Sequence, residues 1–247
     1  MYSRAVVTLT VVLLMAAVAI FLTVAAALGA FRPVTPADLA ALGDFERIEL
    51  AANGSMHIIQ GERSAIVIDA PARELRKLTV TVSDRTLRIE PRWPWPGLLA
   101  PAGDAIRYDV TVRDLRALTL AGMGEISIDG LDETALELRL TGGPGIITID
   151  NLSTHQLTVV LADGATVTVA GVAADQAVSI AGDGNYKAER LESETARVQL
   201  SGGGVAVLRV SDALDVEILG AGRVGYYGDP IVTQRIEGEG GLERLGE

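Results

Sequence analysis

The chain has 247 residues, a formal net charge of −11 and no cysteine, and 49 % of its residues are hydrophobic although only 4 % are aromatic. The lack of cysteine excludes disulfide frameworks, thiolate zinc sites, cysteine nucleophiles and lipid-modified N-terminal cysteines. The acidic balance argues against binding to a nucleic-acid backbone, and a core with so few rings must consist of Val, Leu, Ile and Ala, which suits many thin β-strands.

The first 30 residues form an apolar segment in which Arg4 is the one charged residue. The uncharged stretch that follows would span roughly 39 Å as a helix, enough to cross a hydrocarbon layer of about 30 Å. A cleaved signal peptide is the alternative, because Ala25-Ala26-Ala27 satisfies an A-x-A cleavage rule. We therefore predict a transmembrane anchor or a signal peptide over residues 1–30. The protein would be a single-pass inner-membrane protein with an extracytoplasmic domain, or a secreted one if the segment is cleaved.

A linker is expected over residues 31–43, which include Pro33 and Pro36. From there to the end the chain shows apolar and polar residues in alternation, which is typical of short β-strands rather than helices. In residues 44–112 this alternation has irregular spacing. We expect this segment to form the N-terminal coils of the same body as the residues that follow, with a small separate β-layer as the alternative.

An internal repeat begins at Leu118 and continues through residue 241. Its units start with a triplet whose outer positions are Val, Leu or Ile and whose middle position is variable: Leu118-Thr119-Leu120, Leu138-Arg139-Leu140, Val159-Val160-Leu161, Val178-Ser179-Ile180, Val198-Gln199-Leu200 and Val216-Glu217-Ile218. The spacings between successive triplets are 20, 21, 19, 20 and 18 residues. Such a period is typical of solenoids and other repeat architectures.

Each triplet is followed by a turn of small residues and then by a second short strand. Glycine takes positive φ angles without a steric penalty, so these glycines are interpreted as structural. The predicted turn glycines are Gly122, Gly124, Gly143, Gly145, Gly164, Gly182, Gly184, Gly202, Gly204, Gly220 and Gly222. One unit departs from the Gly-x-Gly pattern by carrying Asp163-Gly164, a permitted variant because Asp tolerates the left-handed region better than most residues.

Two strands in about 20 residues cannot bury an apolar face alone, so successive units must stack. We therefore predict an all-β fold, a single-stranded parallel β-helix or solenoid with coils of about 20 residues and Gly-x-Gly corners, over residues 44–241. A seventh triplet, Gln234-Arg235-Ile236, would form an atypical capping coil with Gln234 in the inward column. Residues 242–247 are expected to be a tail.

The chain resembles a bacterial family, the "putative auto-transporter adhesin, head GIN domain" proteins, over about Gly43 to Gly241. The motifs that carry the resemblance are Phe45-x-x-Ile48-x-Leu50, Leu115-x-x-Leu118-x-Leu120-x-Gly122-x-Gly124, the serial Gly-x-Gly turns, Gly220-x-Gly222-x-Val224 and Tyr227-Gly228-x-Pro230. The resemblance implies an exported β-solenoid with a role in surface or envelope adhesion and without an accepted catalytic set.

Enzymes that cleave carbohydrates also use β-helical folds and need two carboxylates roughly 5 to 9.5 Å apart. Asp129 and Asp150 lie at matching positions near the second corner of their units, with Glu189 further along. They are interpreted as solvated strand ends, with a carbohydrate-active site or a weak divalent-cation site as alternatives. The two histidines, His57 and His155, have no partner at a motif spacing, and the sequence predicts no catalytic, cofactor or metal residue.

A loop around Trp93 and Trp95 holds both tryptophans between prolines, in Arg92-Trp93-Pro94-Trp95-Pro96. Paired indoles on a stiff loop can contact a sugar, a bilayer surface or a protein, or they can fold back over the end of the solenoid. We predict an envelope-anchored, non-catalytic surface module with an adhesive, binding or structural role. Its expected partners are the membrane through residues 5–30 and a glycan or protein ligand, with self-assembly into a homo-oligomer as a further alternative and no nucleic acid.

Overall fold

A computed structural model of the protein describes residues 43–92 and 106–246. The predicted anchor or signal over residues 1–30, almost all of the linker, and the Trp93 and Trp95 loop lie outside the described residues. Within the described ranges no helix is long and apolar enough to cross a membrane.

The described residues form strands almost throughout. The strands are β1 (Arg47–Leu50), β2 (Gly54–Gln60), β3 (Ala65–Asp69), β4 (Leu78–Ser83), β5 (Thr86–Pro91), β6 (Arg107–Val112), β7 (Ala117–Ala121), β8 (Gly124–Ile128), β9 (Leu131–Thr141), β10 (Ile146–Ala162), β11 (Thr166–Ala181), β12 (Asn185–Gly202), β13 (Val205–Gly220), β14 (Arg223–Tyr227), β15 (Ile231–Glu237) and β16 (Gly241–Gly246). One short helix, α3, spans Ala72–Leu75. The all-β prediction is therefore confirmed.

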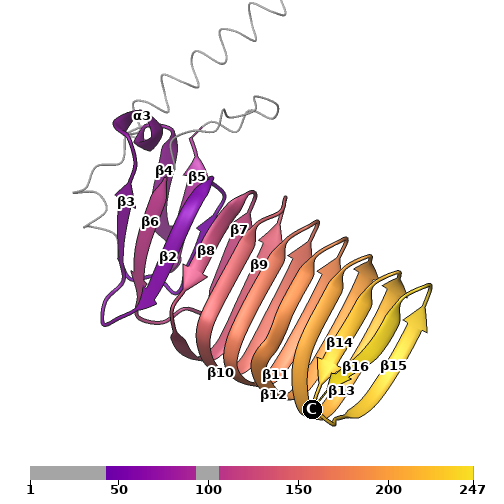
Figure 1. The fold of residues 1–247 in the computed structure, drawn as a ribbon. Coiled ribbons are helices and arrows are strands. Elements are labelled where there is room, and N and C mark those ends of the chain that lie inside the picture. The colour runs from indigo at the N-terminus through magenta and orange to yellow at the C-terminus, as the bar shows by residue number, and fades with distance from the viewer. Residues whose placement is uncertain (1–42, 93–105, 247) are drawn as a thin grey trace, which may run out of the picture. The chain divides into compact units, whose positions relative to one another are not determined.

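From β7 onward the chain winds into a parallel β-solenoid, which makes about six turns in all (Figure 1). Each turn crosses two faces. Face A contains β7, β9, β15 and the second part of each of the long strands β10 to β13, and face B contains β8, β14, β16 and the first parts of β10 to β13. Every pair of neighbouring coils in this region is parallel, as in the registers Ile147↔Val167 on face B and Val159↔Val178 on face A. The predicted 20-residue coil is confirmed.

The interior is filled by the aliphatic columns that the sequence predicts. Each first residue of the six triplets is at most 3 % exposed: Leu118, Leu138, Val159, Val178, Val198 and Val216. The middle residues of the triplets point outward, because side chains alternate between the two sides of a strand. The columns from both faces meet in one continuous core cluster that also includes residues of the N-terminal strands.

The glycines of the corner from face A to face B serve two different purposes. The first glycine of each Gly-x-Gly turn has a positive φ, for example 129° at Gly122 and 95° at Gly182. The second glycine does not, but a Cβ at Gly145 would lie 2.6 Å from Cδ2 of Leu120 in the preceding coil. In the variant turn Asp163 takes the left-handed position with φ of 57°. Gly164 is its middle residue, and a Cβ there would meet open space.

The N-terminal strands join the same sheet but in an order that differs from their order in the chain. On face A, β1 lies between β5 and β7 and is parallel to both. On face B, β2 lies between β6 and β8 and is also parallel to both. The first strands of the domain, β1 and β2, therefore form the coil next to β7 and β8. The strands β5 and β6 form the coil on its other side. The N-terminal strands and the regular coils therefore belong to one sheet.

Two antiparallel strands depart from the expectation of parallel N-terminal coils. β3 is antiparallel to β6, and β4 is antiparallel to β5 across a tight turn at Asp84 and Arg85, both of which have positive φ. α3 connects β3 to β4 (Figure 1). β3 and β4 therefore lie outside the last parallel coil and run in the opposite direction. They end the parallel ladder at this end of the stack, which is a common way to protect a sheet edge.

The C-terminal end of the stack also differs from one sequence expectation. Residues 242–246, expected as part of a tail, continue as β16, because Leu242 stands opposite Val224 in a parallel ladder with β14. The seventh triplet forms β15, in which Gln234 stands opposite the inward Val216. Gln234 itself is exposed, since no further coil covers it among the described residues.

Candidate binding surface

The acidic edge predicted near the second corner holds Asp129 and Asp150 on neighbouring coils. Asp129 and His57 share a hydrogen bond, with 2.9 Å between Oδ1 and Nε2. Asp150 and Asp129 follow the paired residues Ile149 and Ile128 on neighbouring strands. Among the described residues, no group of three or more histidine or acidic side chains could hold a metal ion. On this edge one carboxylate, that of Asp129, contacts a histidine.

The second histidine also lies beside a carboxylate. The Nε2 atom of His155 is 4.0 Å from Oδ2 of Asp175, and the other carboxylate oxygen accepts a hydrogen bond of 2.5 Å from the Thr195 hydroxyl. The carboxylate thus stands between hydroxyl and imidazole. In a nucleophilic triad the imidazole must stand between them, because it takes the proton from the hydroxyl. The three side chains are therefore not arranged as a nucleophilic triad, and they connect three successive coils.

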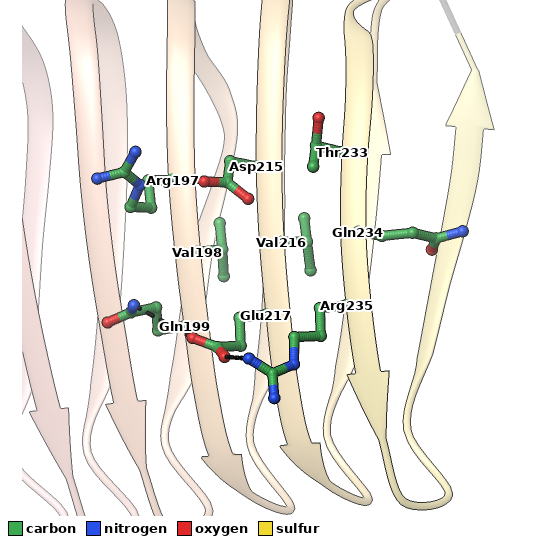
Figure 2. A pocket seen from close by; sticks show the side chains of 9 residues that line it. All are labelled: Arg197, Val198, Gln199, Asp215, Val216, Glu217, Thr233, Gln234 and Arg235. Carbon is green, nitrogen blue, oxygen red and sulfur yellow. Dashed lines mark hydrogen bonds and ion pairs between the residues drawn. The ribbon is translucent and has the colours of Figure 1, made fainter.

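Face A carries rows of paired charges across neighbouring coils. Figure 2 shows Arg197, Asp215 and Thr233 in one outward row and Gln199, Glu217 and Arg235 in another, with Val198, Val216 and Gln234 between them. Nitrogen–oxygen distances are 3.2 Å from Arg197 to Asp215 and 3.5 Å from Arg235 to Glu217. The hollow between these rows is about 290 Å³. Its charges already neutralise one another, so the surface offers a ligand little electrostatic attraction.

A larger hollow of about 810 Å³ lies at the second corner, where the chain passes from face B to face A. We call it the corner groove. It crosses the corners of five successive coils and is lined by Thr154, His155, Val172, Ala173, Ala174, Glu192, Ser193, Glu194, Arg209, Val210, Ser211, Gly228 and Asp229.

The corner groove combines an apolar floor with an acidic rim. Val172 is 55 % exposed in it, an unusual position for a large aliphatic side chain, and the buried Val210 also lines it. Glu192 and Glu194 are exposed on the rim. Asp229 also lies on the rim and pairs with Arg244 at 3.2 Å. The groove can therefore offer an apolar contact and negative charge side by side.

Arg209, the one arginine of the lining, is held in place by the protein itself. Its guanidinium carbon lies 5.0 Å from the centroid of the Tyr227 ring, and its Nε donates a 3.2 Å hydrogen bond to the Glu189 carbonyl. A guanidinium stacked on a ring gains from the cation–π interaction. These contacts orient Arg209 as part of the wall.

A chain of buried hydrogen bonds fixes the coils beneath the groove. The Tyr186 hydroxyl donates to Oε1 of Gln176 at 2.6 Å, and Nε2 of Gln176 donates to the Ser193 hydroxyl at 2.7 Å. Ser193 in turn donates to the Arg209 carbonyl at 2.7 Å. Burial raises the pKa of Tyr186 above its ordinary value. The groove wall is therefore tied across three coils.

A further polar hollow of about 600 Å³ surrounds Glu133, which sequence reasoning did not identify. Burial raises the pKa of this carboxyl above its ordinary value, and the Leu115 amide donates to it at 2.6 Å. Gln60 also donates to it at 3.2 Å. No sequence pattern connects positions 60, 115 and 133, since only the crossed N-terminal strands bring them together. The three residues join the crossover after β6 to the regular coils.

The sequence and the fold both have known relatives. Residues 44–230 match the model of the family described as "Putative auto-transporter adhesin, head GIN domain". A search of curated proteins by sequence gives no match.

Solved structures share the fold at low sequence identity. A crystal structure of a "putative adhesin" from Bacteroides fragilis superposes with a TM-score of 0.77 at 21 % identity, covering 83 % of this chain and 94 % of that one. A "Putative lipid binding protein" from Parabacteroides distasonis gives a TM-score of 0.69 at 19 % identity with the same coverage. A "putative adhesin" from Parabacteroides merdae gives 0.63 at 20 % identity, covering 83 % and 93 %.

Proposed function

The chain belongs to the "Putative auto-transporter adhesin, head GIN domain" family, and on that premise we propose that it is an envelope-anchored, non-catalytic binding module. Residues 1–30 would anchor it in the inner membrane, or direct secretion if they are cleaved. Residues 31–43 would link that segment to the extracytoplasmic solenoid that begins at residue 44. The loop with Trp93 and Trp95 would add a second contact surface.

The corner groove carries this proposal. It sets an exposed aliphatic side chain, Val172, beside the carboxylates of Glu192 and Glu194 on a wall held by buried hydrogen bonds. A rigid wall lowers the entropic cost of binding, because few side chains must be ordered when the ligand arrives. Small residues such as Ala173, Ala174 and Ser211 leave room for an extended ligand.

The charge of the protein selects among ligands. With a net charge of −11 and an acidic rim, the groove repels anionic ligands and attracts cationic ones. We therefore propose that the ligand is an extended polypeptide segment that carries Lys or Arg side chains beside an apolar residue. The basic side chains would meet Glu192 and Glu194, and the apolar residue would cover Val172.

Peptide arrays tested against the purified protein would examine this function. Lys-containing extended peptides should bind, Glu-containing peptides of equal length should not, and binding should weaken as salt is added, because exposed charges are screened. The double variant Glu192→Gln and Glu194→Gln should lose about tenfold in affinity, equal to about 1.4 kcal/mol. The matched control is Glu125→Gln, an exposed carboxylate on face B. Equal affinity of both variants for the basic peptides would refute the groove as the site.

A lipid acyl chain is the second candidate, favoured by the exposure of Val172 and by the lipid-binding description of one structural neighbour. Binding that is insensitive to salt and to the two carboxylate variants, but is lost on Val172→Asp, would indicate an acyl chain.

The carbohydrate-active alternative makes a separate prediction. Release of reducing ends from glycans, abolished by Asp129→Asn, would establish an enzyme and overturn the non-catalytic proposal.

A further inference from the structure

The C-terminal end of the solenoid has an edge that is not paired within the described residues. β15 pairs with β13 on one side and β16 pairs with β14 on one side, and no other described strand pairs with either of them. An open strand edge presents a row of backbone donors and acceptors that can pair with another strand.

Exposed large aliphatic side chains gather at the same end. Among the described residues, five of the ten exposed large hydrophobic side chains lie on β13, β15 or β16: Val205, Leu219, Ile231, Ile236 and Leu245. Ile231 is 80 % exposed, and Ile236, which belongs to the inward column, is still 37 % exposed. Two of the five, Ile231 and Ile236, lie on the open strand β15 itself, where pairing with another protein strand would cover them.

The N-terminal end of the stack is built differently. There the last strands, β3 and β4, are antiparallel to their neighbours, and the inward Val80 and Val82 of β4 pack against the core. A parallel coil added at that end would meet strands of the opposite direction. The two ends of the stack therefore present different edges to a second copy.

We propose that the C-terminal end binds the same end of a second copy of this chain, with β15 of the two copies antiparallel and Gln234 opposite Gln234 on the two-fold axis. In this register the seven residues of β15 pair over their full length. Val232 of each copy stands opposite Ile236 of the other, which extends the apolar interior across the interface. The two amides at the centre can bind each other, since an amide side chain both donates and accepts.

Self-complementarity is what favours a second copy over an unrelated strand. An antiparallel strand with this sequence places aliphatic residues opposite aliphatic ones on the inward side and Arg235 opposite Thr233 on the outward side, so no like charges stand directly opposite. Pairing of identical ends closes after two copies, whereas pairing of unlike ends would produce open filaments. The expected assembly is a dimer, whatever ligand the corner groove binds.

A single introduced cysteine tests the register directly, because the natural chain contains none. In an antiparallel pair, directly opposite Cα atoms are about 4.5 to 5.5 Å apart, within the range that a disulfide requires. In the full-length protein, Gln234→Cys should give a covalent dimer under mild oxidation, and the control Glu125→Cys on face B should not. Equal crosslinking of the two variants, or none in either, would contradict the proposal.

Charge substitutions at the same position supply an independent test that does not disturb folding, because Gln234 is exposed. Gln234→Lys and Gln234→Glu should each be monomeric in analytical ultracentrifugation, since like charges would meet on the axis. An equimolar mixture of the two should regain the dimer. A natural protein that stays monomeric at all concentrations, that forms filaments, or whose dimer survives both substitutions would overturn this assembly.

Discussion

The two parts of the solenoid reach the same architecture by different routes. In residues 113–246 each coil pairs with the coil about 20 residues away, so neighbours in space are neighbours in sequence. In residues 44–112 the first two strands are inserted between later ones, and contacts such as that of Gln60 with Asp132 join residues 72 apart. The regular part, residues 113–246, can form coil by coil. The crossed part, residues 44–112, must close long loops before its contacts stabilise it.

The largest effect on the regular part is expected from its corner backbone. Gly171 has φ of 127°, and a Cβ there would lie 2.1 Å from the carbonyl oxygen of Leu152 in the preceding coil. Gly171→Ala should therefore lower the free energy of unfolding by roughly 3 kcal/mol. Gly164→Ala is the matched control, because that position has open space and should be neutral or stabilising by up to about 1 kcal/mol.

Hydrogen exchange on these two variants would show whether the parts of the solenoid behave differently. If the coils act as a one-dimensional stack, Gly171→Ala should reduce amide protection most in β10, β11 and β12 and least in β1 to β6. Uniform loss of protection along the chain would mean that the crossed and the regular parts unfold as one unit.

A smaller effect is expected from the buried hydrogen bonds of the regular part. Tyr186→Phe leaves Oε1 of Gln176 without its donor in an apolar interior and should cost about 1–3 kcal/mol at neutral pH. Burial raises the pKa of Tyr186, so the unfolded tyrosine ionises first and stability falls as the pH rises above about 10. The Phe variant lacks this loss, so its disadvantage in denaturant titrations should shrink at alkaline pH. A constant difference would show that the hydroxyl is not buried.

In the crossed part, a buried carboxylate with two ion pairs stands in place of these buried hydrogen bonds. Glu46 is 6 % exposed, and its carboxylate pairs with Arg85 in the β4–β5 turn and with Arg116 after the crossover, the latter at 3.4 Å. Both arginines are largely exposed, so water screens the pairs, and Glu46→Gln should cost only about 1 kcal/mol. Added salt should reduce that cost in thermal unfolding. Glu49→Gln, which removes a half-exposed pair with Arg88, should cost less.

The sequence predicts the regular part well and the crossed part poorly, for a physical reason. The triplets from Leu118 to Ile218 encode both strand and register, because each unit repeats the same alternation at nearly constant spacing. The insertion of β1 and β2 has no such local signal. The turn at Asp84 and Arg85 contains neither Gly nor Asn, although both of its residues have positive φ.

The corner groove was equally hidden from sequence reasoning. Its lining comes from five coils, at residues 154–155, 172–174, 192–194, 209–211 and 228–229, which share no motif. Each segment contributes two or three ordinary residues of a corner. Only the stacking brings Val172 beside Glu192 and Glu194, so the pattern of a single unit carries no information about the hollow.

The smallest predicted effect lies at the junction between the two parts. Burial raises the pKa of Glu133, so its contribution to stability is fully present below the ordinary value of 4.5 and is lost as the pH rises through the folded-state pKa. Glu133→Gln keeps an oxygen that can accept from the Leu115 amide but cannot ionise. The variant should therefore gain stability relative to the natural protein as the pH rises from about 4 to 7, by roughly a few tenths of a kcal/mol, because the group is partly exposed.

Denaturant titrations at a series of pH values would measure this difference, with Asp132→Asn as the control on the adjacent exposed carboxylate. If the junction is held by hydrogen bonds to Glu133 regardless of its charge, the variant should also keep the protection of the amides at Leu115 and Arg116. A variant that loses this protection while Asp132→Asn retains it would show that the crossed part depends on the charge of Glu133. The amides of β11 to β13, which lie further along the stack and pair with no crossed strand, should be unaffected in either case.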